Sequence, residues 1–343
     1  MSRLLSDLGV ELPVLAAPMA GGASTSELVT AAARSGGLGF LAGGYKTAQA
    51  LAEEIGAVRA EAVPFGVNLF AANPVPISSE VYRRYARTLQ PEADRYGLKL
   101  NDGKPVEDDD DWAQKIDLII EASVPWVSFT FGVPDPSVIK ALRRSGTTVL
   151  QSVTSADEAR QAAEAGVDAL ILQGSAAGGH SATLTPDRPL TPAPLPALIA
   201  SVRRTITLPL IATGGIANAA DVAAALHAGA DATMIGTVLL RTDESGASAP
   251  YKKALADAVF DATVMTRAFT GRPARALRNH FTDEYDPVAP LGYPALHHLT
   301  APLRKAATAA GDTRLIHLWA GTGYRQAKKE PAAHTLKRFA SLL

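Results

Sequence analysis

The sequence of 343 residues predicts an α/β protein, a TIM (β/α)8 barrel with a smaller capping or lid domain. Two observations lead to this prediction. Short, nearly continuous apolar runs recur eight times, as expected for strands buried on both faces. Alanine-rich stretches lie between most of them, begin with Ser, Thr or Asn and often end at Gly, as capped helices do. Eight evenly spaced βα units favour a closed barrel over an open doubly wound sheet.

The eight apolar runs have similar lengths and are interpreted in order as the barrel strands: 13–19, 37–43, 64–70, 125–131, 147–153, 168–174, 208–214 and 231–237. The helical stretches between them include TSELVTAAARSG, TAQALAEEIGAVRA, SADEARQAAEAG and NAADVAAALHAG. Active sites of TIM barrels lie at the face where the strands end. The residues that follow these strands are therefore the first candidates for function.

Two segments interrupt the repeat. Residues 73–114 come between the third and fourth strands, and residues 246–343 follow the eighth. We expect 1–72 and 115–245 to form the barrel, and the two other segments to form a capping, substrate-binding region over its functional face. The alternative is surface elaboration without a role in the site.

An acidic run, Glu107 to Asp111, precedes the helix-like stretch WAQKIDLIIEA. Acidic side chains are favourable at a helix N-terminus because of the helix dipole. We interpret the run as helix capping and a solvated surface, and we predict no metal site.

Composition excludes several classes of function. A net charge of −1 provides no bulk attraction to nucleic acid or to a membrane surface. The absence of cysteine excludes disulfides, thiolate catalysis and iron–sulfur clusters. No run approaches the ~18 apolar residues of a membrane span. Asp7, Glu11 and Pro13 interrupt what would otherwise resemble a signal peptide. We expect a cytoplasmic protein, either a monomer or a homodimer.

The strongest chemical signal is the stretch LIATGGIANAADVAAALHAGADATMIGT, residues 210–237. One predicted strand ends in Gly214 and Gly215 before a capped helix, and the next ends in Gly236 and Thr237. Glycines expose backbone N–H groups, and the following helix adds the positive end of its dipole. Two such turns on adjacent strands predict a phosphate site where TIM barrels usually have one, although tight turns alone would also need glycines.

Other strand ends indicate what carries the phosphate. Met19 follows the first strand, Asn68 lies at the end of the third, and Gln173 ends the sixth. Carboxamides both donate and accept hydrogen bonds, which suits the polar edge of a flat heteroaromatic ring. Flavin mononucleotide (FMN) has one phosphate and one such ring and needs no covalent link. A sugar phosphate is the alternative.

These motifs together resemble the nitronate monooxygenases. The resemblance spans about residues 12–280 and is carried by AAPM followed by GG, PFGVNLF, VSFTFGVP, LILQGSAAGGHSATL, LIATGGI, MIGT and TRAFTGRPARALRN. It implies a TIM-barrel enzyme that holds FMN through Met19, Asn68, Gln173, Gly178, Gly215, Met234, Gly236 and Thr237. It also implies that His180 is the catalytic base, with Gly178 and Gly179 letting the backbone pass close to the cofactor.

The substrate side includes two departures from the family pattern. Related sequences often have a histidine where this chain has Thr130 and an acidic residue where it has Ala176, so both departures reduce polarity near the pocket. Tyr251 is a further candidate. So are Tyr324 and Lys328, which would share one helix face at their spacing of four. The YxxxK pattern does not indicate a short-chain dehydrogenase, because no GxGxxG loop follows the first strand.

Two other histidines, His297 and His298, could face the pocket or each other. The resemblance implies oxidation of alkyl nitronates, such as propionate-3-nitronate, and of nitroalkanes, with dioxygen as the electron acceptor. The alternatives are an NAD(P)H:quinone reductase or an enoyl-acyl-carrier-protein reductase of the same superfamily. A non-redox isomerase or synthase that binds a sugar phosphate is an alternative of another class.

Overall fold

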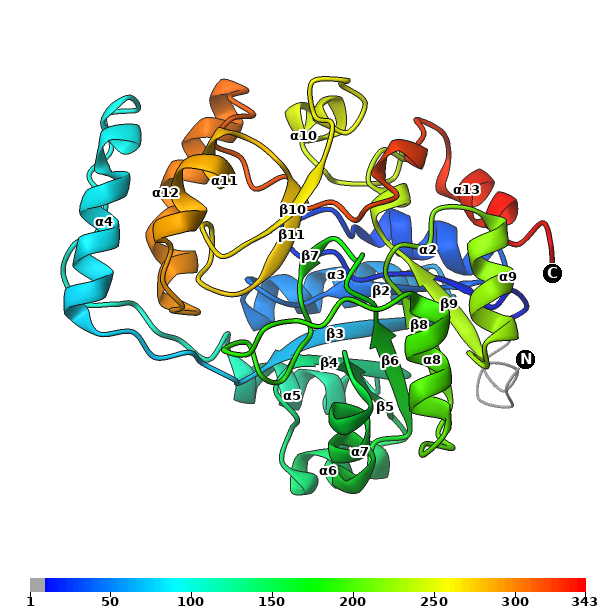
Figure 1. Ribbon diagram of the computed structural model, residues 1–343. Coiled ribbons are helices and arrows are strands. Elements are labelled where there is room, and N and C mark those ends of the chain that lie inside the picture. The colour runs from blue at the N-terminus through cyan, green and yellow to red at the C-terminus, as the bar shows by residue number, and fades with distance from the viewer. Residues whose placement is uncertain (1–9) are drawn as a thin grey trace.

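Eight parallel strands close into a barrel in the computed structural model, which describes residues 10–343 (Figure 1). The strands follow one another in chain order, and β1 pairs with β9 to close the barrel. Their bounds are β1 Val14–Ala16, β2 Leu38–Ala42, β3 Phe65–Ala71, β4 Trp126–Phe131, β5 Thr148–Val153, β6 Ala169–Gln173, β8 Leu210–Thr213 and β9 Ala232–Ile235. Each of the eight predicted strands overlaps one of them, so the predicted TIM barrel is confirmed. Residues 1–9 of the predicted barrel segment 1–72, including Asp7, lie outside the described residues.

Helices surround the barrel, and those formed by the alanine-rich stretches begin where the sequence predicts. Their bounds are α2 Ser26–Arg34, α3 Ala48–Ala60, α5 Trp112–Glu121, α6 Pro136–Arg144, α7 Ala156–Ala165, α8 Leu195–Arg203 and α9 Ala219–His227. The side chains of Thr25, Thr47, Ser155 and Asn218 each accept a hydrogen bond from the first turn of their helix. These caps satisfy backbone N–H groups that have no partner within the helix.

Burial on both faces explains why the strands are nearly continuous apolar runs. In β4, Trp126 packs inside the barrel against Phe40, whereas Val127 and Phe129 pack against the surrounding helices. The polar Ser128 and Thr130 alternate with them and hydrogen-bond to Asn68 on β3. Successive side chains of a strand point to opposite faces, so these polar groups face the barrel interior toward the ends of the strands.

The cap is assembled from both segments outside the barrel repeat. Helix α4 (Ser79–Asp94) lies beside α12 (Ala295–Ala310) and shares an apolar core with α11 (His280–Tyr285), as Figure 1 shows. An antiparallel sheet of β10 (Thr263–Thr266), β11 (Ala274–Leu277) and β7 (Gly179–His180) connects this cap to the barrel. The short α10 (Ala249–Ala254) precedes that sheet.

The last helix, α13 (Ala332–Phe339), packs against α2 and α9 of the barrel. This helix belongs to the predicted cap segment 246–343 but lies in the helical layer around the barrel. The division of the chain into barrel and cap segments stays a prediction. Among the described residues, no helix has the length and apolar character needed to cross a membrane.

The acidic run does not cap its own helix, which corrects the prediction. Asp111 precedes α5 but makes no side-chain capping bond. Its backbone is left-handed (φ 54°), and its carboxylate accepts a hydrogen bond from the Ala48 N–H at the start of α3. Asp110 accepts from the Tyr45 N–H and pairs with Lys115 at 2.8 Å. The acids therefore connect the loops that begin α3 and α5.

Candidate active site

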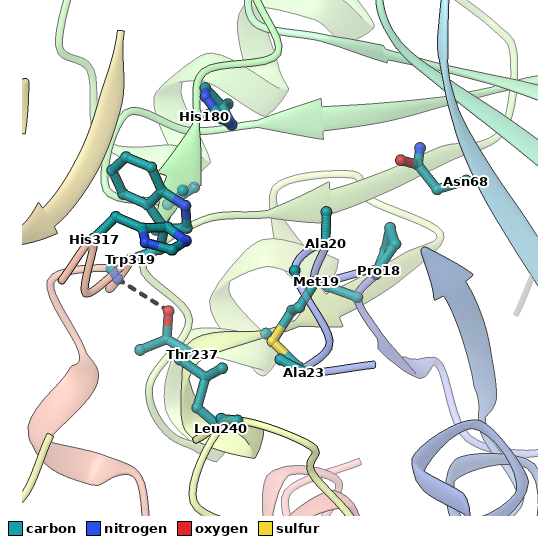
Figure 2. Close-up of a pocket in the computed structure, with 18 of the residues that line it drawn as sticks. Pro18, Met19, Ala20, Ala23, Asn68, His180, Thr237, Leu240, His317 and Trp319 are labelled. Atoms are coloured by element: carbon teal, nitrogen blue, oxygen red, sulfur yellow. Dashed lines mark hydrogen bonds between the residues drawn. The ribbon is translucent and has the colours of Figure 1, made fainter. Parts of the chain in front are cut away.

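A cavity of about 690 Å³ lies where the barrel strands end, and residues of the cap complete its wall (Figure 2). Pockets of this size are typical of cofactor and small-molecule sites. All of the residues predicted to bind the cofactor line it: Met19, Asn68, Gln173, Gly178, Gly179, Gly214, Gly215, Met234, Gly236 and Thr237. His180, Thr130 and Tyr251 also line it.

The two glycine turns form one end of the cavity. Gly214 and Gly215 have φ of 100° and 81°, conformations that favour glycine. A Cβ on Gly215 would stand 2.8 Å from the Cβ of Ala176, so the turn has no space for a side chain. Within residues 10–343 the backbone N–H groups of Gly215 and Thr237 have no hydrogen-bond partner. Free N–H groups beside the N-terminus of α9 are suited to a phosphate.

The cap contacts this end through a hydrogen bond. The Gly321 N–H donates to Thr237 Oγ1 at 2.9 Å, the dashed line in Figure 2. The side chain of Ala176 beside this turn is only a methyl group. An anion bound at Gly215 would therefore meet no carboxylate at Ala176.

Two carboxamide side chains lie at the strand ends and have different hydrogen-bond partners. Asn68 Nδ2 donates to Ser128 and to Thr130 Oγ1 at 3.0 Å, so the orientation of its amide is fixed. Gln173 donates from Nε2 to the His180 carbonyl at 3.1 Å and accepts at Oε1 from the Ala182 N–H at 2.8 Å. Gln173 therefore anchors the loop that carries His180, in addition to lining the cavity.

His180 is positioned by its strand pairing and by the close contact between the backbones at Gly178 and Gly321. It pairs with Ala274 of β11, and a Cβ on Gly178 would stand 2.4 Å from the Gly321 nitrogen. The ring is hydrogen-bonded through Nε2 to Thr270 Oγ1 at 2.8 Å. Its ring centroid is 5.4 Å from that of Trp319 and 5.5 Å from that of Phe131.

The electrostatic environment keeps the His180 imidazole neutral. Burial deep in the protein, and then the charges of Arg272 and Arg304, lower the pKa of His180 to about 3. The residue as a whole is half-buried, and it lines the cavity. A neutral imidazole can accept a proton at neutral pH, although a lowered pKa makes it a weaker base.

Two predicted substrate residues lie away from the cavity. The Tyr324 hydroxyl donates to the Phe260 carbonyl at 2.6 Å within the cap core, and Lys328 is exposed. The predicted shared helix face is wrong, because the 3-10 helix there spans only Tyr324–Gln326. Tyr251 does line the cavity, and its hydroxyl is engaged by the Trp319 carbonyl.

Several polar and aromatic residues that the sequence did not single out line the other end of the cavity: Tyr45, Thr270, Arg304, His317 and Trp319. Figure 2 shows His317 and Trp319 across from Asn68, with Met19 between them in this view. Of the two histidines that could face the pocket, His297 lines the cavity, whereas His298 pairs with Asp108 at 2.9 Å. Most of these residues belong to the cap, where no βα repeat marks the end of a strand.

The model of the nitronate monooxygenase family matches residues 2–339. The chain belongs to this family, which is flavin-dependent, and it is an oxidoreductase. Probable nitronate monooxygenases of Staphylococcus aureus strains MRSA252 and MSSA476 are 35% identical over 339 residues, which cover 96% of this chain and 94% of theirs.

Solved structures extend the comparison. A nitroalkane oxidase from Streptomyces ansochromogenes is 46% identical with a TM-score of 0.93, and the match covers 99% of this chain and 97% of that one. FabK from Thermotoga maritima is 27% identical with a TM-score of 0.76, covering 99% and 95%. The resemblance found in the sequence is confirmed, and so is its conclusion that the protein is an enzyme that oxidises nitro compounds.

Proposed function

We propose that this protein is an FMN-dependent enzyme that oxidises alkyl nitronates, such as propionate-3-nitronate, and nitroalkanes, with dioxygen as electron acceptor. The observation that carries the proposal is that one cavity holds both two glycine turns with free backbone N–H groups and a neutral histidine. The family and the nitroalkane oxidase neighbour support the substrate class.

The residues present fit FMN. In the proposal, Gly214, Gly215, Gly236 and Thr237 hold the phosphate through backbone N–H groups and a helix N-terminus. The ring then lies along the remaining lining residues predicted for the cofactor: Met19, Asn68, Gln173, Gly178, Gly179 and Met234. When bound, the flavin accepts electrons from the substrate and passes them to dioxygen.

His180 acts as general base toward a neutral nitroalkane. The Thr270 hydroxyl can donate to the Arg272 carbonyl (3.4 Å) and accept from His180 Nε2–H, which leaves the lone pair on Nδ1. Nδ1 then accepts the α-proton of the substrate, and the imidazolium is stabilised by the nitronate formed beside it. A nitronate arrives already deprotonated and does not need this step.

The test is the identity of the cofactor together with oxygen consumption. We expect the purified protein to be yellow, to release FMN and not FAD on denaturation, and to consume oxygen when a nitronate is added without NAD(P)H. Chromatography of the released cofactor and an oxygen electrode measure both. A colourless protein that cannot be reconstituted would favour the non-redox sugar-phosphate alternative.

The second candidate is an NAD(P)H-dependent reductase acting on a quinone or an enoyl-acyl carrier protein. The similarity to FabK favours it, though at lower identity than the nitroalkane oxidase. Rapid NAD(P)H oxidation without nitronate turnover would replace the first proposal by this one. A cytoplasmic location and a monomeric or homodimeric state stay predictions.

A further inference from the structure

Arg304 is a buried cation in the wall of the cavity. It lies on α12, is 6% exposed and lines the cavity together with His180. Its Nε donates to Thr300 Oγ1 at 3.0 Å, and its Nη2 donates to the His297 carbonyl at 3.0 Å. These bonds hold the guanidinium in one orientation.

No carboxylate balances this charge. Within residues 10–343, Arg304 makes no salt bridge, whereas the exposed Arg314 pairs with Asp312 at 3.0 Å. Besides the His297 carbonyl, the Arg304 terminal nitrogens contact two imidazole nitrogens, His317 Nε2 and His297 Nδ1, each at 3.3 Å. Burial and the nearby Arg304 charge hold the pKa values of His297 and His317 well below 6.5, so neither supplies a counter-charge.

A second buried arginine shows what a purely structural guanidinium looks like in this protein. Arg272 is fully buried and does not line the cavity. It donates to the carbonyls of Asn73 and Thr183, and its guanidinium carbon stands 4.1 Å over the Phe131 ring. Carbonyl groups and an aromatic face therefore surround it. Arg304 differs because one side of its environment is the open cavity.

A buried charge is costly unless it is paired, so an unpaired cation beside a ligand cavity points to an anionic ligand. We propose that Arg304 is the anion-binding residue of the substrate subsite and takes the nitronate or carboxylate group of a small organic acid. His297 and His317 orient the guanidinium by accepting its N–H groups. The inference rests on the proposed function, and it names the residue that makes that site select negatively charged substrates.

The test is binding of nitrate, a planar monoanion, to the oxidised flavin-loaded enzyme by isothermal titration calorimetry. With the phosphate turn occupied by the cofactor, nitrate reports on the remaining cavity. We expect Arg304→Met to weaken nitrate binding about ten- to hundredfold, as loss of a charge-assisted hydrogen bond should. Arg304→Lys keeps the charge without the fork, and we expect an intermediate loss.

Lys305→Met is the matched control. Lys305 is the next residue of α12, lines the cavity and is exposed, so its removal deletes the same charge without the buried contact. We expect it to change nitrate affinity less than about threefold, because exposed charges are screened. Circular dichroism identifies any variant that fails to fold, and Arg304→Lys then replaces Arg304→Met in the comparison.

Three outcomes would overturn the inference: wild-type enzyme that does not bind nitrate, a folded Arg304 variant that binds it normally, or equal losses in Arg304→Met and Lys305→Met. Nitrate binding that depends on Arg304 in an enzyme without nitronate oxidation would instead retain the subsite and reject the proposed function. Nitronate oxidation with an unchanged KM in Arg304→Met would retain the function and reject the subsite.

Discussion

The proposed phosphate end of the cavity, at Gly215 and Thr237, is built from backbone, whereas the end around His180 is built from side chains. At the first end, Gly215 and Thr237 offer N–H groups from turns on the adjacent strands β8 and β9. At the second, His180 hydrogen-bonds to Thr270 and lies within electrostatic reach of Arg304 and His317, all three from the cap. The first end depends on local turn geometry, and the second depends on how the cap docks on the barrel. The two ends should therefore respond differently to substitution and to pH.

The largest effect is expected at the phosphate end, from Gly215→Leu. A side chain there would meet the Cβ of Ala176 at 2.8 Å and would require a left-handed backbone at φ 81°. It would also cover the N–H groups of the turn. We expect loss of flavin retention with the barrel still folded, measured by the ratio of visible to protein absorbance and by circular dichroism.

Gly146→Leu is the matched control for backbone strain. Gly146 has φ of 86°, and a Cβ there meets nothing within 4 Å. It follows α6, before β5 begins, and does not line the cavity. It should cost about 1–2 kcal/mol of unfolding free energy, as a left-handed residue does, and retain its flavin. Full flavin occupancy in Gly215→Leu would refute the phosphate site.

A smaller effect is expected at the other end, from His180→Asn. The asparagine keeps a polar group but cannot act as a base at neutral pH. General bases contribute about 10²–10⁴-fold in rate. We expect activity on a neutral nitroalkane to fall by that factor and activity on a nitronate to fall much less, in steady-state oxygen-uptake assays on both forms.

His298→Asn should leave both activities unchanged, because His298 pairs with Asp108 and does not line the cavity. Flavin content should be normal in both variants. Equal losses on both substrates in His180→Asn would mean that the residue binds the anion or orders its loop. An enzyme that accepts only nitronates would leave His180 without a role as base.

The smallest effect is the acid sensitivity of the histidine end. The pKa values of His180, His297 and His317 are all lowered, so these residues are neutral in the folded protein where they are protonated in the unfolded chain. The unfolded state then binds more protons below pH 6.5, and the unfolding free energy falls as pH decreases through that range. Linkage limits the slope to about 1.4 kcal/mol per pH unit for each histidine.

Urea unfolding at pH 7.5, 6.5 and 5.5 measures this slope. His317→Gln should reduce this slope by up to the contribution of one histidine. His227 lies on the exposed face of α9, and His227→Gln should not reduce the slope. The backbone turns at the phosphate end contain no group that titrates in this range. A slope that His317→Gln leaves unchanged would show that the protonation of His317 is not linked to folding.

Local patterns in the sequence determined the barrel and the glycine turns of the proposed phosphate end. A strand buried on both faces needs a continuous apolar run, and each helix needs a cap at its first turn, so both leave their signature within a few residues. The turns at Gly214–Gly215 and Gly236–Thr237 follow directly from the ends of those strands. Because all strands of a TIM barrel end at one face, the sequence alone could also place Met19, Asn68 and Gln173 beside them.

Only the tertiary structure decided the other end. His297, Arg304, His317 and Trp319 come from a segment without a repeat, and nothing in their spacing shows which side chains face the cavity. The lack of a repeat in this segment also explains the error at Tyr324 and Lys328, where an i, i+4 spacing suggested a helix face that the chain does not form. An unbalanced charge such as that of Arg304 becomes visible only when every nearby carboxylate has been placed, because electrostatic pairing depends on distance in space and not on position in the chain.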